Sequence, residues 1–161
     1  MLLLIAILAV ILLFGFVIFF GAPYLPTMQK QREDALELLG LARGQLLLEL
    51  GCGDGRMLIT AAKKGIYSVG YELNPILFIY SKLACLRYRQ FITVKYGNYW
   101  HKNWPQADGI YVFLHTRFMS NLDKKITQQQ CSKKVKVVSY AFKIPSKNVV
   151  KSKDAMFLYE Y

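Results

Sequence analysis

Three glycines and the acidic residues around them are the part of this sequence whose spacing most clearly predicts chemistry. The stretch LLLELGCGDGRM, residues 46–57, ends an apolar run in Glu49 and continues into a glycine-rich turn. The glycines are Gly51, Gly53 and Gly55. Glycine lets the backbone turn sharply and approach a bound molecule closely. Glu49 and Asp54 make the turn acidic, which suits a ligand with a cationic amino group and sugar hydroxyls better than a pyrophosphate.

A further acidic residue, Glu72, supports a nucleoside-type ligand. It follows the apolar segment SVGY, roughly 20 residues beyond the glycines, where an acid accepts hydrogen bonds from ribose hydroxyls in dinucleotide-binding folds. The dinucleotide pattern is G-x-G-x-x-G, whereas this chain has G-x-G-x-G. NAD is therefore the weaker candidate.

Alternating strands and helices are expected to position these residues. The apolar run at 46–50 is typical of a strand buried on both faces, and residues 56–64 predict the helix that follows it. Further strands are expected at 68–71, 92–96, 109–114, 135–140 and 155–161, and further helices at 29–41, 76–89 and 119–129. Residues 143–154 read as a loop. This order predicts an α/β fold: a Rossmann-like, doubly wound, mainly parallel sheet with helices on both faces. The ligand is then expected beyond the carboxyl ends of the strands.

The N-terminus predicts a membrane anchor that precedes the α/β domain. Residues 1–20 carry no charged side chain, and about 20 apolar residues suffice to cross a bilayer as a helix. A cleaved signal peptide is the alternative, but it would begin with basic residues and end in small ones. We therefore expect a transmembrane anchor at 1–22 and one domain at 23–161. The basic residues follow the run, which places that domain on the cytoplasmic or mitochondrial matrix side.

The charge and the cysteines leave several partners open. The net charge is +11, which suits anionic lipid headgroups, nucleic acid or simply a solvated surface. Three cysteines, Cys52, Cys85 and Cys131, are far apart and contain no C-x-x-C pair. They predict neither zinc nor a redox couple, and they agree with a reducing compartment.

At the glycine turn the sequence resembles class I, seven-strand S-adenosylmethionine-dependent methyltransferases. LELGCGDGR and VGYELNP resemble the first two cofactor motifs of that superfamily. The resemblance implies that the residues lining the methionine part of the cofactor are Glu49, Gly51, Cys52, Gly53 and Gly55. It implies that Glu72 binds the ribose and that Leu73 lies against the adenine. After the third strand the superfamily often has an acid that bonds the adenine amino group, and here Asn98 stands in its place.

The segment GIYVFLHTRF, residues 109–118, contains the fourth strand and the turn after it, where the superfamily acts on the methyl acceptor. It lacks the N/D-P-P-Y type motif of adenine and many glutamine N-methyltransferases, which disfavours that route. His115 is a candidate general base because imidazole titrates near neutral pH, and Tyr111 and Thr116 are further candidates. A structural role for His115 is the alternative. Tyr99 and Trp100 can hold a cationic amine against their rings or pack in the core. No cluster of His and Asp predicts a metal site.

A closer resemblance covers nearly the whole domain. APYLPT directly after the apolar run, together with YVFLHTRFMSNLDKK and VKVVSYAFKIP, resembles small membrane-anchored protein lysine methyltransferases. Mitochondrial members of that family modify the adenine nucleotide translocase and the ATP synthase c-subunit. The resemblance implies that Pro23, Tyr24, Pro26 and Thr27 help to shape the cofactor or substrate pocket, whereas a plain juxtamembrane turn is the alternative.

These observations predict an enzyme that transfers a methyl group from S-adenosylmethionine to a lysine of a membrane protein. Nucleic acid is the disfavoured partner because of the anchor and the missing N-P-P-Y motif. Two alternatives remain open: an RNA or small-molecule methyltransferase of the same fold, and a cofactor-binding module without turnover.

Overall fold

The computed structural model describes residues 1, 3–5, 7–8, 11, 15, 25–130 and 132–161. The predicted anchor at 1–22 falls mostly outside these residues, as do Pro23, Tyr24 and Cys131. In the described part of the chain, no helix has the length and apolar character needed to cross a bilayer.

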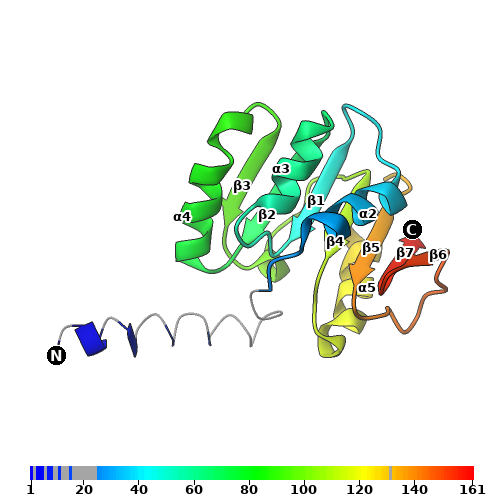
Figure 1. The fold of residues 1–161 in the computed structure, drawn as a ribbon. Coiled ribbons are helices and arrows are strands. Elements are labelled where there is room, and N and C mark those ends of the chain that lie inside the picture. The colour runs from blue at the N-terminus through cyan, green and yellow to red at the C-terminus, as the bar shows by residue number, and fades with distance from the viewer. Residues whose placement is uncertain (2, 6, 9–10, 12–14, 16–24, 131) are drawn as a thin grey trace.

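A mixed sheet of seven strands organises the described domain (Figure 1). The strands are β1 (Leu46–Leu50), β2 (Tyr67–Glu72), β3 (Ile92–Tyr96), β4 (Gly109–Val112), β5 (Lys136–Tyr140), β6 (Lys151–Lys153) and β7 (Met156–Glu160). Their order across the sheet is β3-β2-β1-β4-β5-β7-β6. The first five strands are parallel, and β7 runs antiparallel to both β5 and β6. The mainly parallel sheet predicted from the sequence is therefore confirmed.

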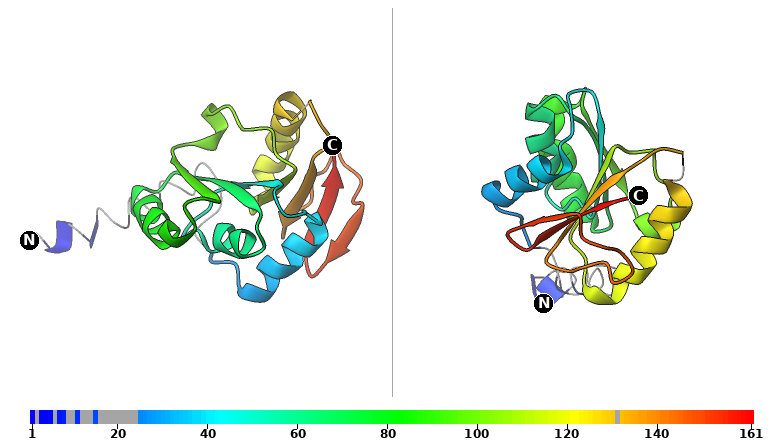
Figure 2. Two further views of the ribbon diagram at one scale, coloured as in Figure 1. Left: turned by 90° about the horizontal axis from the view of Figure 1, so that it is seen from above. Right: turned by 90° about the vertical axis from the view of Figure 1, so that its right-hand side faces the viewer.

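Helices cover both faces of this sheet, as the sequence predicts. They are α2 (Gln29–Leu39), α3 (Arg56–Lys63), α4 (Pro75–Ala84) and α5 (Met119–Gln129), with short 3-10 turns η1 (Leu86–Tyr88), η2 (Tyr99–His101) and η3 (Thr116–Phe118). Helices α2, α3 and α4 lie on one face, and α5 lies on the other (Figures 1 and 2).

The residues of β1 show why the strand sits at the centre of the sheet. Leu48 and Leu50 pack into the cluster that contains the apolar residues of α5, whereas Leu47 packs into the cluster beneath α2. Successive side chains of a strand point to opposite faces, so a strand covered on both faces must be apolar at each position. Burying one leucine side chain contributes roughly 1.5–3 kcal/mol. Glu49, which is only 6% exposed, interrupts this run with a carboxyl group.

The C-terminal part of the sequence prediction is wrong at one strand. Residues 143–154 were expected to form a loop with a single strand after it, but Lys151–Lys153 forms β6 and pairs with β7. This edge strand reads KSK and is largely exposed, so no alternation of apolar residues marks it. The helix predicted at 76–89 also ends earlier, at Ala84. Cys85 is buried there with its sulfur 3.9 Å from the Gly55 carbonyl oxygen, and the chain tightens into η1.

Helix α4 carries a row of exposed apolar side chains. Ile76, Ile79, Tyr80 and Leu83 are 44–62% exposed, and their spacing places them on one side of the helix. Among helices α2, α3, α4 and α5, only α4 presents such a row.

Candidate active site

The turn after β1 lies at the carboxyl edge of the sheet, where ligands of open parallel sheets bind. The backbone φ angles of Gly51, Gly53 and Gly55 are all positive, at 87°, 54° and 80°. Residues other than glycine rarely adopt this region. The backbone N–H groups of Gly51 and Cys52 donate to the Tyr71 carbonyl at 3.0 and 2.8 Å, which ties the turn to β2.

The glycines of the turn serve two different purposes. A Cβ at Gly55 would lie 2.8 Å from the sulfur of Cys85, so this glycine allows α3 and α4 to approach each other. A Cβ at Gly51 would meet nothing within 4 Å. The space in front of Gly51 is open, and Gly51 is exposed. The backbone there is accessible to a ligand.

Glu72 joins the turn to the start of α4. Its side chain is 5% exposed, and its two oxygens accept hydrogen bonds from Gly53 N at 2.7 Å and Asn74 N at 2.8 Å. Burial raises the pKa of Glu72, although the backbone N–H groups oppose that shift. Asn74 in turn caps α4 by accepting from Ile76 N at 2.9 Å. Each Glu72 oxygen keeps a second lone pair, so the carboxylate can accept further hydrogen bonds from sugar hydroxyls.

Glu49 is the most unusual acid of the site. One of its oxygens, Oε2, is buried and has no hydrogen-bond partner within the described structure. Burial raises the pKa of Glu49 well above its usual value, and the nearby charges of Asp54 and Glu72 raise it further. Asp54 is itself 8% exposed and pairs with Arg56. A buried carboxyl group with an unpartnered oxygen costs stability. A cation bound beside Glu49 would pair with that oxygen and offset the cost.

Thr27 and Tyr111 connect the residues before α2 to the site. The hydroxyl groups of Thr27 and Tyr111 lie 3.3 Å apart, and Tyr111 stands opposite Glu49 in the register of β4 with β1. Arg32 holds the segment by donating from Nη1 to the Thr27 carbonyl oxygen at 2.5 Å and from Nε to Thr60 Oγ1 at 3.0 Å. Pro26, which directly precedes Thr27, is exposed. Thr27 therefore lies beside the acidic edge, and the role of this segment in shaping a pocket stays a prediction.

Asn98 follows Gly97, which is hydrogen-bonded to Glu72, and its side chain already caps a short helical turn. The backbone N–H of Gly97 donates to the Glu72 carbonyl oxygen at 2.8 Å, which brings the end of β3 to this edge. The Asn98 side chain accepts from Trp100 N at 2.9 Å and caps η2. Its amide nitrogen and second lone pair remain for an adenine contact. Leu73, also predicted to contact adenine, is half-buried beside Glu72.

Tyr99 and Cys52 are placed in the core rather than in an open site. Tyr99 is 7% exposed and belongs to the main apolar cluster, and burial raises the pKa of its hydroxyl. Trp100 is half-buried and packs against Phe118 with ring centroids 6.0 Å apart. Core packing, the alternative left open for Tyr99, matches these contacts. Cys52 is 4% exposed and belongs to an apolar cluster with Leu58 and Cys85, and burial raises the pKa of its thiol well above the usual value.

His115 and Thr116 both lie on the surface after β4. The His115 Nδ1 atom accepts from Arg117 N at 3.4 Å and caps η3, and its ring lies 5.5 Å from that of Phe142. The structure brings Tyr111, but not His115, into the hydrogen-bonded group around Thr27. The structural alternative for His115 is thus consistent with its observed contacts.

Arg32 and Asn74 take part in the site and were not identified as site residues from the sequence. Asn74 directly precedes Pro75, and Asn followed by Pro is a sequence signal for the cap and first position of a helix. Burial lowers the pKa of Arg32, and Arg56 lowers it further. No motif singles Arg32 out, because its role arises from the packing of α2 against α3.

A seven-strand sheet with a glycine turn after its first strand and a buried acid after its second defines the class I methyltransferase fold. Residues 49–151 match the family described as the ANTKMT methyltransferase domain. The chain is 34% identical over 125 residues to the human lysine N-methyltransferase of the ATP synthase c-subunit. That match spans 76% of this chain and 53% of the human protein. This chain is also 31% identical over 141 residues to a "Protein-lysine N-methyltransferase" of Saccharolobus islandicus. That second match covers 82% of this chain and 86% of that protein. The chain therefore belongs to the ANTKMT methyltransferase domain family.

The solved structures agree with this fold. An RNA methyltransferase from Salinibacter ruber, in complex with S-adenosyl-L-homocysteine, superposes with a TM-score of 0.77 at 22% identity, covering 85% of this chain and 92% of that one. At that identity the likeness shows the fold alone. The chain spans about half the length of the first vertebrate relatives that it matches.

Proposed function

We propose that this protein transfers a methyl group from S-adenosylmethionine to a lysine side chain of a protein. The observation that carries the proposal is the buried, unpartnered oxygen of Glu49, located beside an open glycine turn. The names of the relatives support lysine as the acceptor. The human relative is named for the ATP synthase c-subunit, and we propose a membrane protein of this kind as the substrate here.

The residues of the site fit this cofactor. Its amino group is a cation, which Glu49 and Asp54 complement, and its ribose hydroxyls match the free lone pairs of the Glu72 oxygens. The open space at Gly51 admits the methionine part close to the backbone. When bound, the cofactor supplies an electrophilic methyl group on a sulfonium sulfur.

The protein must align a neutral lysine amine with that methyl group. In the transfer the amine nitrogen forms a bond to the methyl carbon, the carbon–sulfur bond breaks, and the sulfur keeps the electron pair. The amine loses one proton to solvent. Alignment alone lowers such barriers substantially, and apolar surroundings favour the neutral amine.

Tyr111 serves this reaction as a positioning residue rather than as a base. Burial raises the pKa of its hydroxyl, so the hydroxyl stays protonated at neutral pH. It therefore holds Thr27 through the 3.3 Å contact and shapes the entrance for the acceptor side chain.

The experiment that tests the proposal uses the full chain in detergent and S-adenosylmethionine labelled in its methyl group. The labelled cofactor is incubated separately with membranes, with RNA and with a lipid extract, and labelled proteins are identified by mass spectrometry. Label on lysines of membrane proteins supports the proposal. Label only in RNA or lipid would favour the RNA or small-molecule alternative, and cofactor binding without any transfer would favour a binding module.

We further propose that residues 1–22 anchor the protein as a single transmembrane helix, with the domain on the cytoplasmic or matrix side. The uncharged apolar run at 1–20 supports this, and so does the exposed apolar row of Ile76, Ile79 and Leu83 on α4. Alkaline carbonate extraction of membranes that carry the full chain should leave it in the pellet. Recovery in the supernatant would rule out the anchor, and protease accessibility in sealed vesicles would report the side.

A further inference from the structure

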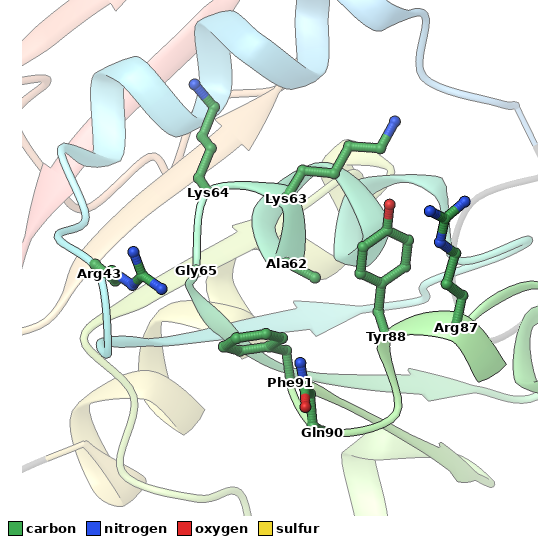
Figure 3. Close-up of a pocket in the computed structure, with 9 residues that line it drawn as sticks. All are labelled: Arg43, Ala62, Lys63, Lys64, Gly65, Arg87, Tyr88, Gln90 and Phe91. Carbon is green, nitrogen blue, oxygen red and sulfur yellow. The ribbon is translucent and has the colours of Figure 1, made fainter.

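A basic pocket lies at the amino edge of the sheet, opposite the candidate active site (Figure 3). Its residues come from the segments that precede β1, β2 and β3. Strands of five or six residues separate the two edges by roughly 17–20 Å. The hollow measures about 460 Å³, within the usual range of small-molecule sites of roughly 300–1,000 Å³.

Four cationic side chains gather at this pocket, and none of the described residues that line it is acidic. The four are Arg43, Lys63, Lys64 and Arg87. Within the part of the chain that the structure describes, none of the four forms an ion pair. They come from three separate segments, so the fold rather than a local run of the sequence brings them together. A concave surface lined by one sign of charge attracts a ligand of the opposite sign.

The position of Arg43 depends on a glycine. Gly65 has a φ of +75°, and a Cβ at Gly65 would lie 2.7 Å from Cγ of Arg43 and 3.0 Å from its Nε. The N–H of Gly44 donates to the Gly65 carbonyl oxygen at 2.9 Å, which fixes the two loops together. The Arg43 side chain therefore lies across Gly65, at one side of the hollow, as Figure 3 shows.

Aromatic rings form the other wall of the pocket. The rings of Tyr88 and Phe91 stand between Arg43 and Arg87 (Figure 3). Phe91 is held by its contact with Tyr67, with ring centroids 5.3 Å apart, and its N–H donates to the Tyr88 carbonyl oxygen at 2.8 Å. The amide of Gln90 adds a neutral donor and acceptor. The pocket thus combines cations with aromatic rings and a side-chain amide.

We propose that this pocket binds a phosphate-bearing anion. Arg43 and Arg87 present planar donor groups that match phosphate oxygens, while Lys63 and Lys64 add compact charges at the rim. The ring surfaces of Tyr88 and Phe91 suit the less polar part of the same molecule. The site does not share a side chain with the candidate active site, so it is independent of the proposed methyl transfer.

The source of the phosphate is either a free polyphosphate or a lipid headgroup, and the test separates them. Binding of tripolyphosphate and of ATP to the full chain in detergent is measured by calorimetry. Binding of phosphatidylcholine vesicles with and without phosphatidic acid is measured by flotation. Saturation by a soluble probe indicates the free source, whereas binding only to the acidic vesicles indicates the headgroup.

Two matched double variants decide whether the pocket is responsible. K63Q/R87Q removes two pocket cations, and K124Q/R89Q removes one lysine and one arginine outside it. Hydrogen bonds to charged groups are among the stronger ones, so K63Q/R87Q should weaken binding at least about tenfold. The control should stay within about twofold of the parent. The proposal is overturned if the parent binds neither kind of probe, or if both variants lose affinity equally. Unchanged S-adenosylmethionine binding shows that each variant is folded.

Discussion

Glu49→Gln tests whether the buried acid at the end of β1 is kept for a cationic ligand at the expense of stability. Glu49 is 6% exposed, and its Oε2 atom has no partner in the described structure. Glutamine has nearly the same shape and carries no charge. The substitution therefore removes the electrostatic penalty while preserving the packing around β1.

The pKa of Glu49 decides whether Glu49→Gln raises or lowers the stability of the fold. Burial, and then the charges of Asp54 and Glu72, raise this pKa above the unfolded value of 4.5. The folded state therefore binds the proton more tightly than the unfolded state does. The stability that Glu49 contributes is fully present below the unfolded pKa and is lost as pH rises through the folded pKa. Glu49→Gln lacks this titration, so its advantage over the parent should grow with pH.

The magnitude is set by the charge, because glutamine keeps a buried polar group at this position and removes only the titration. Each unit by which burial raises the pKa of Glu49 corresponds to about 1.4 kcal/mol, so we expect the variant to be more stable than the parent by at least about that amount near pH 8. For a chain of this size each kcal/mol raises the melting temperature by about 2–4 °C. The loss of one charge-assisted contact should weaken S-adenosylmethionine binding by about 1.5–3 kcal/mol, or roughly 10- to 150-fold.

Thermal unfolding and calorimetry at about pH 5 and about pH 8 measure both effects on the full chain in detergent. Glu37→Gln is the control, since Glu37 is exposed and pairs with Lys153 at 2.7 Å. An exposed ion pair contributes little to stability, so the control should unfold and bind the cofactor as the parent does. A Glu49→Gln protein that is less stable than the parent at both pH values, or that binds the cofactor equally well, would refute the reasoning.

Four further substitutions separate the roles of individual residues of the site. Tyr111→Phe removes the contact to Thr27, so stability should fall by about 0.5–1.5 kcal/mol, and KM for the protein substrate should rise while the cofactor Kd is unchanged. Gly51→Ala should cost about 1–2 kcal/mol from its positive φ alone, whereas Gly55→Ala adds a clash worth about 1–3 kcal/mol more; chemical denaturation compares the two. His115→Asn preserves a cap on η3, and steady-state kinetics should show activity within about threefold of the parent, whereas loss of a true general base would cost at least about 100-fold.

The fold was predictable where burial leaves a clear pattern. The apolar runs of β1 and β3 and the apolar spacing of α5 mark elements whose bounds agree with the sequence prediction. β6 gave no such signal, because an exposed edge strand of three residues needs no apolar face. Its pairing is determined by the neighbouring strand β7 rather than by its own composition.

The site was predictable where chemistry depends on a residue type at a fixed spacing. The spacing of the three glycines and of Glu72 can be found from the sequence. The structure shows that these glycines have positive φ and that Gly53 is hydrogen-bonded to Glu72. Arg32 could not be found in this way, because its contacts with Thr27 and Thr60 arise from tertiary packing. Tyr99 shows the converse, since its type suits a cationic amine but its position is in the core.

The distribution of charge explains why the acids are gathered at one edge. The chain has ten acidic residues against twenty-one basic ones, and its net charge would repel both a cationic cofactor and a protonated lysine. Three of the ten acids, Glu49, Asp54 and Glu72, are buried together at the carboxyl edge of the sheet. Their low-dielectric surroundings make their attraction stronger than that of exposed charges at equal distance. The acids are therefore gathered at the edge where the proposed cationic cofactor would bind, while the pocket at the opposite edge is lined by cations, in keeping with the net charge of the whole protein.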